Sequence, residues 1–228
     1  MAARLSPTPG SSVIIATKSY ALAAVAESIA QSLPKEIIAL CNGISHVDQI
    51  HALPADRVTC GSIKIVSERT GPGEYVHHSS FTMIDVEEAA ADWDAVSSLG
   101  RAGIAVNPAG SEMEVLWRKL RFLAPMALLT ASTGLPLGKA LVGSEALNAE
   151  VAQIATASGL PTKPVEILAS LKKVAPDSTS SLARDVEAGN PTELDALGRD
   201  LVRKAEKLGI DTPAIAGAVA AIEERIAT

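Results

Sequence analysis

The sequence predicts an α/β N-terminal part followed by an all-helical C-terminal domain. Three observations support this fold class: a strand, helix, strand order over residues 13–41, strand patterns over residues 57–86, and almost continuous helical periodicity after residue 110. We therefore expect two domains, the first spanning residues 1–108 and the second residues 109–228. A chain of 228 residues is long enough to bury a core in each.

The composition excludes several classes of partner. The chain is 47% hydrophobic and 20% charged, which is typical of a soluble globular protein. Only 3% of its residues are aromatic and its formal net charge is −6, so base stacking and polyanion binding are disfavoured and no nucleic-acid partner is expected. No apolar run is long enough to span a bilayer, and residues 1–10 lack the apolar core of a signal peptide, so we expect no membrane partner.

The two cysteines, Cys41 and Cys60, are too few for a disulfide framework and lie in strand-like surroundings. We expect reduced, buried thiols and a cytoplasmic location, because a reducing compartment keeps such thiols free.

The N-terminal part begins with a βαβ unit. The apolar run 13–16 predicts a strand buried on both faces, residues 22–29 have helical spacing, and residues 36–41 repeat the strand signal. The two strands should be parallel, and ligands gather at the carboxyl ends of such strands, where Lys18 and Asn42 lie. Each also has a purely structural explanation, as a solvated lysine and as half of an Asn-Gly turn.

Further along the chain, residues 57–86 predict strands in hairpin succession with a turn at 71–73, followed by a helix over 87–101. Pro108 and Gly110 make residues 106–110 a candidate domain junction. Helices are then expected over residues 111–128, 136–158, 163–174, 180–188, 191–208 and 212–226.

Lys119 lies in the middle of an apolar helix face. At about 100° per residue, the apolar side chains of the helix 111–128 fall within about 60° of it, and these are Val115, Leu116, Phe122, Leu123 and Met126. Such a lysine either extends its ammonium group to solvent or is kept in a cleft as a proton donor or anion ligand.

The stretch 180–195 contains a helix end and a helix start. Gly189 suits the C′ position of the first helix, Asn190 the N-cap of the second, and Glu193 the N3 position of a capping box. A carboxylate at a helix N-terminus also stays ionised and is a fixed acceptor for a ligand hydroxyl, so the two roles are compatible. Ser181 brings a hydroxyl group to the other helix start, and it could be simply part of that start.

No metal site is expected. The four histidines lack zinc-motif spacing, and His77 and His78, adjacent on a strand, would point to opposite faces.

Together these positions resemble the ketopantoate reductase family, which reduces 2-dehydropantoate to pantoate with NADPH. The resemblance runs from about residue 12 to the C-terminus, and its most specific part is Ser-Ser-Leu-Ala-Arg-Asp-Val-Glu-Ala-Gly-Asn-Pro-Thr-Glu-Leu-Asp at 180–195. Lys18-Ser-Tyr, Asn42-Gly and Trp117-Arg-Lys-Leu also match. The resemblance implies an incomplete Rossmann-like sheet followed by a helical domain of the 6-phosphogluconate dehydrogenase C-terminal type, and a homodimer.

The resemblance also implies roles for individual residues. Lys119 would be the general acid that protonates the developing alkoxide, and Glu193 and Ser181 would hold the hydroxyl groups of the substrate. Asn42 would bind the substrate or the nicotinamide ribose, and Lys18 would lie along the NADP cofactor. The hydride chemistry itself belongs to the cofactor.

Two departures from the family pattern lead to further expectations. The chain contains no Gly-x-Gly-x-x-Gly turn, which would seat the pyrophosphate, so NADPH binding is expected to be weak or lost. A non-catalytic binding or dimerisation protein derived from the family is therefore the competing hypothesis. Leu123 and Ala127 stand where family members commonly carry asparagines, so the substrate is expected to be 2-dehydropantoate or a related 2-oxo acid.

Overall fold

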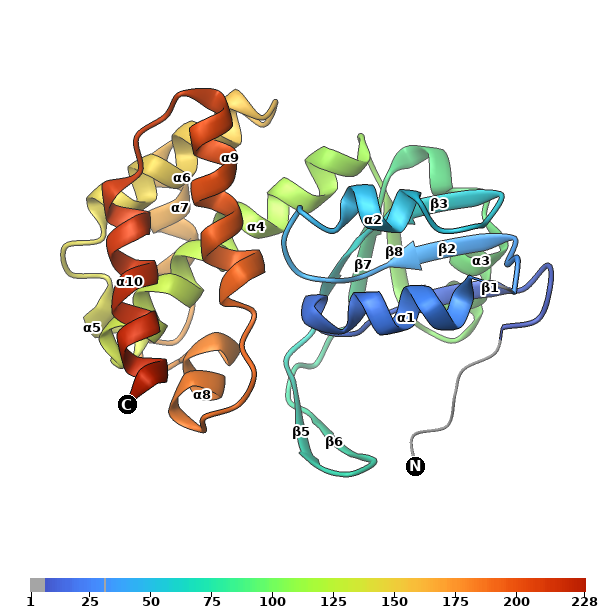
Figure 1. Cartoon of the computed structure of the whole chain (residues 1–228), viewed down its shortest axis with the longest axis horizontal. Coiled ribbons are helices and arrows are strands. Elements are labelled where there is room, and N and C mark those ends of the chain that lie inside the picture. Colours follow the sequence, from blue (N-terminus) through green and yellow to red (C-terminus); the bar gives the residue numbers. More distant parts are fainter. Residues whose placement is uncertain (1–6, 31) are drawn as a thin grey trace. The chain divides into compact units, whose positions relative to one another are not determined.

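The computed structural model describes residues 7–30 and 32–228, and the chain divides into two compact units (Figure 1). Unit 1 comprises the residues up to Cys41 together with His46–Leu116. Unit 2 comprises Asn42–Ser45 and Trp117–Thr228. Helix α4 (Glu112–Thr133) therefore contributes its first turn to unit 1 and the rest to unit 2.

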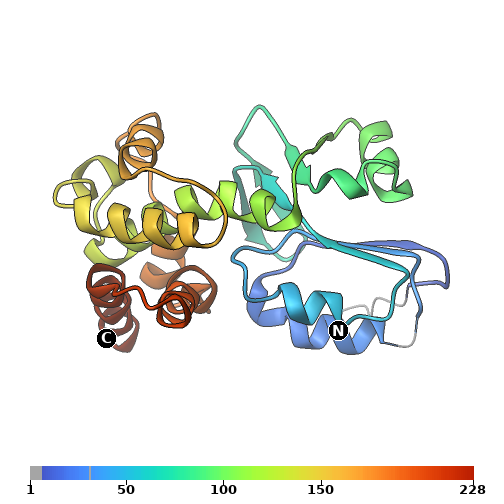
Figure 2. The same ribbon diagram turned by 90° about the horizontal axis from the view of Figure 1, so that it is seen from above.

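Unit 1 contains all eight strands of the described residues. They are β1 (Ser12–Ile15), β2 (Glu36–Ala39), β3 (Arg57–Cys60), β4 (Ser62–Lys64), β5 (Ser67–Gly71), β6 (Glu74–His77), β7 (Met83–Val86) and β8 (Ala105–Pro108). Its helical segments are the 3₁₀ turn η1 (Ser19–Ala21), α1 (Leu22–Ile29), α2 (Val47–His51), the 3₁₀ turn η2 (Glu88–Ala90) and α3 (Asp94–Arg101). In Figure 2, α1 and α2 lie on one side of the strands β1–β3 and α3 lies on the other.

The predicted parallel pair is confirmed, with Val13 of β1 opposite Ile37 of β2. All four residues of β2 are buried, as expected for a central strand. In β1, however, Val13 and Ile15 are buried while Ile14 is 38% exposed. The prediction that this strand is buried on both faces is wrong, because β1 lies at the edge of the sheet and a short apolar run does not distinguish an edge strand from a central one.

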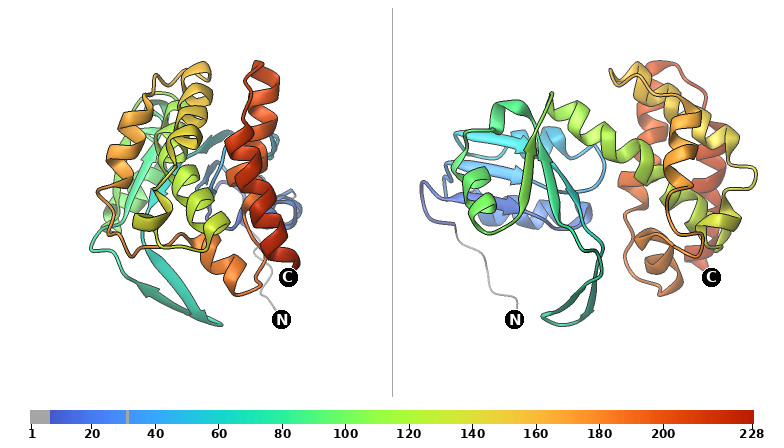
Figure 3. Two further views of the ribbon diagram at one scale, coloured as in Figure 1. Left: turned by 90° about the vertical axis from the view of Figure 1, so that its left-hand side faces the viewer. Right: turned by 180° about the vertical axis from the view of Figure 1, so that it is seen from behind.

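Only part of the predicted hairpin succession is present. β3 continues the parallel sheet beside β2, so the hairpin prediction is wrong there. The chain then passes through Gly61 into a second sheet of order β4–β7–β8, and a Cβ at Gly61 would lie 2.9 Å from the Asp85 carbonyl oxygen. The β5–β6 hairpin is confirmed, with its turn at Pro72 and Gly73, and it extends away from the other strands of the unit (Figure 3).

The two larger sheets share one apolar core with η2 and α3. Its buried members include Ile38 and Leu40 from the first sheet, Ile84 and Val86 from the second, and Trp93. The helix predicted over 87–101 is interrupted at Trp93, whose backbone is extended and which forms the N-cap of α3. The predicted single helix is therefore a 3₁₀ turn followed by α3.

Glu36 fixes the start of α3 to the first sheet. Its side chain is buried, and its carboxylate accepts hydrogen bonds from Asp94 N at 3.1 Å, Ala95 N at 2.9 Å and Ser12 Oγ at 2.8 Å. A carboxylate from a neighbouring strand thus satisfies backbone N–H groups that the first turn of a helix leaves unpaired.

Both cysteines are free and buried, as predicted. Burial raises the pKa of the Cys60 thiol well above its usual value, and the nearby Glu112 carboxylate raises it further. Glu112 also accepts a hydrogen bond from Cys60 N at 2.6 Å and contacts His51 Nε2 at 2.9 Å, so α2, β3 and the start of α4 are joined within unit 1.

Unit 2 is helical, as predicted. After α4 it contains α5 (Leu137–Ala140), α6 (Glu145–Ala157), α7 (Pro164–Leu171), α8 (Ser181–Glu187), the π-helical turn η3 (Asp195–Arg199), α9 (Asp200–Leu208) and α10 (Pro213–Ala227). α6 packs against α7, α9 and α10 (Figure 1). The helix predicted over 136–158 is divided by a turn at Leu141–Ser144, where Gly143 adopts a φ of +79° that continues no helix.

No helix within residues 7–30 and 32–228 has both the length and the apolar character needed to cross a bilayer.

Replacing Glu36 by alanine should lower the free energy of unfolding of unit 1 by about 2 kcal/mol, because the N–H groups of α3 lose their acceptor in a buried position. Denaturation in urea can be followed through Trp93, the only tryptophan of unit 1, in a Trp117→Phe background. Asp56→Ala removes an exposed carboxylate from the same unit and is the matched control. Equal midpoints for the two variants would contradict this role of Glu36.

Candidate functional site

Three of the predicted site residues meet in unit 2, around the side-chain amide of Asn42. Lys119 Nζ donates a hydrogen bond to Asn42 Oδ1 at 2.8 Å. Asn42 Nδ2 donates to Glu193 Oε2 at 3.0 Å. One amide therefore joins the ammonium and carboxylate groups that the sequence singled out, although Lys119 and Glu193 lie 77 and 151 residues from Asn42 along the chain.

The chemistry of the three groups sets the orientation of this amide. An ammonium group only donates hydrogen bonds and a carboxylate only accepts them, so the amide oxygen must face Lys119 and the amide nitrogen must face Glu193. A flipped amide would place its NH₂ donors against the ammonium donors of Lys119 and its oxygen against the carboxylate oxygens of Glu193. Asn42 is thereby held in one orientation, with its dipole aligned between two opposite charges.

Lys119 is half-buried on α4, one turn after the buried Val115. Of its apolar neighbours on the helix wheel, Val115 and Leu116 are buried and the others are half-buried, while on the opposite side Arg118 is exposed and Glu114 and Arg121 are half-buried. The ammonium group donates a hydrogen bond to a protein acceptor, and its role as a proton donor or anion ligand stays a prediction. An ammonium group held in this way is suited to donate a proton or to bind an anion.

Glu193 does not form the predicted capping box. The chain is non-helical from Asn190 to Glu193, and helical structure begins at Leu194. The carbonyl oxygen of Glu193 accepts the first helical hydrogen bond, from Leu197 N at 3.0 Å. Glu193 directly precedes the helical residues, is only 3% exposed, and its carboxylate accepts a hydrogen bond from Asn42 Nδ2.

The segment after Asn42 packs tightly against η3. Gly43 has a φ of +90°, and a Cβ there would lie 2.8 Å from the Ala196 carbonyl oxygen. The π-helical turn contains Ala196, and such turns often occur at functional sites. The Asn-Gly dipeptide signalled the positive φ in the sequence, but nothing in the local pattern signalled the π-helical turn or its approach to Gly43.

Ser181 is the first residue of α8 and is half-buried in unit 2. The helix is capped by the preceding residue, Ser180, whose Oγ accepts from Ala183 N at 3.0 Å.

At the C-terminal end of α8, Gly189 has a φ of +65° and Asn190 N donates to Asp185 O at 2.8 Å, which confirms the predicted C′ glycine in a Schellman motif. The role of Ser181 in binding substrate stays a prediction.

Lys18, the predicted cofactor ligand, belongs to unit 1. It follows β1 and forms the N-cap of η1, with a half-buried side chain. Its position after the carboxyl end of a parallel strand is the predicted one, and its role stays a prediction. In the part of the chain that the structure describes, no three His, Cys, Asp or Glu side chains form a group suited to a metal ion.

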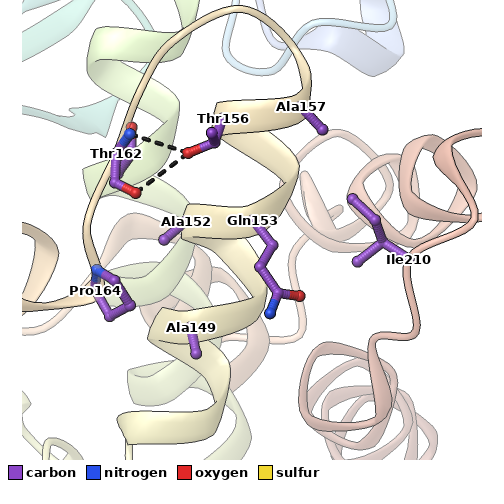
Figure 4. Close-up of a pocket in the computed structure, with 8 residues that line it drawn as sticks. All are labelled: Ala149, Ala152, Gln153, Thr156, Ala157, Thr162, Pro164 and Ile210. Atoms are coloured by element: carbon purple, nitrogen blue, oxygen red, sulfur yellow. Dashed lines mark hydrogen bonds between the residues drawn. The ribbon is translucent and has the colours of Figure 1, made fainter.

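A separate apolar groove of about 540 Å³ lies on unit 2 beside α6 and the start of α7 (Figure 4). Thr162 N donates to Thr156 Oγ1 at 3.0 Å, and this hydroxyl donates to Thr162 O at 3.2 Å, which closes the loop between the two helices. The groove is lined by Ala149, Ala152, Gln153, Thr156, Ala157, Thr162, Pro164 and Ile210. None of the predicted site residues is among them.

The chain belongs to the ketopantoate reductase PanE/ApbA family. The family model for the C-terminal part matches residues 112–225, and the model described as ketopantoate reductase PanE/ApbA matches residues 3–89. The fold class predicted from the sequence, an α/β part followed by a helical domain, is the two-domain fold of this family. The chain is therefore assigned to a family of oxidoreductases, and the competing hypothesis of a non-catalytic derivative is not favoured.

Individual relatives agree with this assignment. The chain is 28% identical over 221 residues to the uncharacterized oxidoreductase YkpB of Bacillus subtilis, covering 89% of this chain and 73% of that protein. It is 35% identical over 105 residues to the 2-dehydropantoate 2-reductase of Pyrobaculum aerophilum, covering 42% and 38%. A crystal structure of a ketopantoate reductase family member from Ralstonia eutropha matches with a TM-score of 0.83 and 24% identity, covering 95% and 76%.

Replacing Gly43 by alanine should destabilise unit 2 more than the same change at Gly189. Both glycines have a positive φ, which costs alanine about 1 kcal/mol, but the Cβ of Gly189 would meet nothing within 4 Å, whereas that of Gly43 would collide with Ala196. We expect the difference in free energy of unfolding to be about 1–3 kcal/mol. It can be measured by Trp117 fluorescence in urea, in a Trp93→Phe background. Equal losses of stability for the two variants would contradict this prediction, because η3 would then accommodate an added Cβ at position 43 without a loss in the free energy of unfolding.

Proposed function

We propose that the chain reduces a 2-oxo acid, 2-dehydropantoate or a related compound, to the 2-hydroxy acid with NADPH. The observation that carries this proposal is the Lys119–Asn42–Glu193 arrangement, which presents a proton donor and a hydrogen-bond acceptor on two sides of one amide. Membership of the ketopantoate reductase family supports the same reaction.

In the proposed reaction Lys119 is the general acid. As hydride reaches the carbonyl carbon, negative charge develops on the carbonyl oxygen, and an ammonium group within hydrogen-bond reach both stabilises that charge and supplies the proton. Glu193, nearly buried and therefore fixed, accepts a hydrogen bond from a hydroxyl or other donor on the substrate. Asn42 holds the two charged groups in position through its hydrogen bonds to both. Ser181 is the further substrate ligand that the family resemblance implies.

The nicotinamide cofactor supplies the hydride when it is bound. Lys18 follows β1 and Asn42 follows β2 in the sequence, and dinucleotides bind at the carboxyl ends of strands in parallel sheets of this class. A lysine ammonium group and a carboxamide suit the phosphate and ribose groups of NADPH, so the residues present fit such a ligand. We also propose that affinity for NADPH is low, because the sequence contains no Gly-x-Gly-x-x-Gly turn.

The face of α4 beyond Lys119 bears on the choice of substrate. Leu123, one turn further along, is half-buried, and Ala127 has no exposed surface. Residues four apart share one face of a helix, so Leu123 contributes hydrocarbon to the face that carries Lys119, whereas the fully buried Ala127 is packed in the interior. A 2-oxo acid with a hydrocarbon side chain should therefore be accepted beside 2-dehydropantoate. The assembly that we expect is a homodimer in the cytoplasm, with a small molecule as the only ligand besides the cofactor.

The Lys119→Ala variant should lose about 10²–10⁴ in kcat, because the chemical step loses its proton donor. NADPH oxidation is measured with 2-dehydropantoate and a panel of 2-oxo acids, at NADPH concentrations near saturation as determined by titration. Lys172→Ala, which removes an exposed lysine of the same unit, is the matched control and should match the parent chain.

Two outcomes would overturn the proposal in different ways. Absence of turnover with every 2-oxo acid at saturating NADPH would reject the reductase activity itself. Turnover that Lys119→Ala leaves unchanged would keep the activity and remove Lys119 from its mechanism.

A further inference from the structure

A buried chain of hydroxyl groups connects α4 with the start of α8 in unit 2. Thr130 of α4 is fully buried, and its Oγ1 lies 2.7 Å from Oγ of Ser180, which is 5% exposed. Thr130 Oγ1 is also 2.8 Å from the Met126 carbonyl oxygen, and Ser180 Oγ is 3.0 Å from Ala183 N. Four groups from two helices thus form one continuous network.

The direction of every hydrogen bond in this network follows from its two ends. The Met126 carbonyl can only accept, so Thr130 must donate its hydroxyl proton to it. The Ala183 N–H can only donate, so Ser180 Oγ accepts from it and gives its own proton to Thr130 Oγ1. Thr130 Oγ1 is therefore the acceptor that sets the rotamer of the Ser180 side chain, and that side chain caps α8.

We propose that Thr130 is a positioning residue for substrate binding, acting through Ser180 on Ser181. Ser180 has an extended backbone, with φ −83° and ψ 161°, and its cap fixes the first turn of α8, where Ser181 begins the helix. Thr130 belongs to the helix that carries Lys119, so the network sets the place of Ser181 relative to the proton donor. This inference rests on the proposed function, because it gives Ser181 a substrate to hold.

Thr133 provides a comparison on the same helix. Its Oγ1 also donates to the carbonyl four residues earlier, Leu129 O at 2.7 Å, but the residue is exposed and its hydroxyl otherwise accepts only from Leu135 N at 3.2 Å. A threonine that bonds back to its own helix is thus not by itself connected to α8. What distinguishes Thr130 is its second, buried bond to Ser180.

The test compares Thr130→Val with Thr130→Ser and with the matched control Thr133→Val in the full chain. Valine keeps the shape of threonine but leaves the Ser180 hydroxyl without its acceptor, so the KM for the 2-oxo acid should rise about tenfold. Loss of a contact made equally to substrate and transition state raises KM and leaves kcat within about twofold. The KM for NADPH should not change. Thr130→Ser should restore the parent KM, and Thr133→Val should equal the parent.

Ser180→Ala breaks the network from the other side and should reproduce the KM effect, which covers the case in which Thr130→Val fails to fold. An unchanged KM for the 2-oxo acid, or an equal loss with Thr133→Val, would overturn the proposal. Hydrogen exchange at the Ala183 amide gives a reading independent of activity and should accelerate about tenfold in Thr130→Val and Ser180→Ala but not in Thr133→Val. If the parent chain shows no turnover, the proposed function fails, and unchanged exchange at Ala183 then rejects the positioning role as well.

Discussion

The carboxylate of Glu193 imposes the constraint on which the candidate site depends. A side chain that is 3% exposed has given up most of its hydration, and a buried carboxylate without donors would be costly by several kcal/mol. Asn42 supplies one of those donors, and its oxygen is then left to face a cation. The amide thus connects an ammonium group and a carboxylate through two hydrogen bonds.

The segment that carries Asn42 is held by shape as well as by charge. Gly43 permits a backbone approach to Ala196 that a side chain would prevent, and the π-helical turn η3 places the Ala196 carbonyl at that point. Four residues of the N-terminal half, Asn42–Ser45, consequently belong to the helical unit. A loop that follows a strand in the sequence is in this way integrated into the packing of α9 and its preceding turn.

Helix α4 connects the features of the helical unit that bear on the proposed reaction. It carries Lys119 towards Asn42, and three turns further on it carries Thr130 into the network that caps α8. One helix, with Pro125 in its interior, therefore carries both the proposed proton donor and the residue proposed to position a substrate ligand. Family membership accounts for the assignment to a class of oxidoreductases.

Local signals in the sequence determined much of the fold. Apolar periodicity predicted the parallel pair β1–β2 and the helices after residue 110, Gly189 predicted a helix end, and the helix wheel drew attention to Lys119. The tertiary structure decided the rest: β1 as an edge strand, β3 in the parallel sheet, the bond between Glu193 and Asn42, and the bond between Ser180 and Thr130. Periodicity and capping preferences act over one or two helical turns. The bonds of Ser180 and Glu193, in contrast, are made to partners 50 and 151 residues away in the sequence. The positions of β1 and β3 depend on the order of strands in the sheet, which no local signal gives.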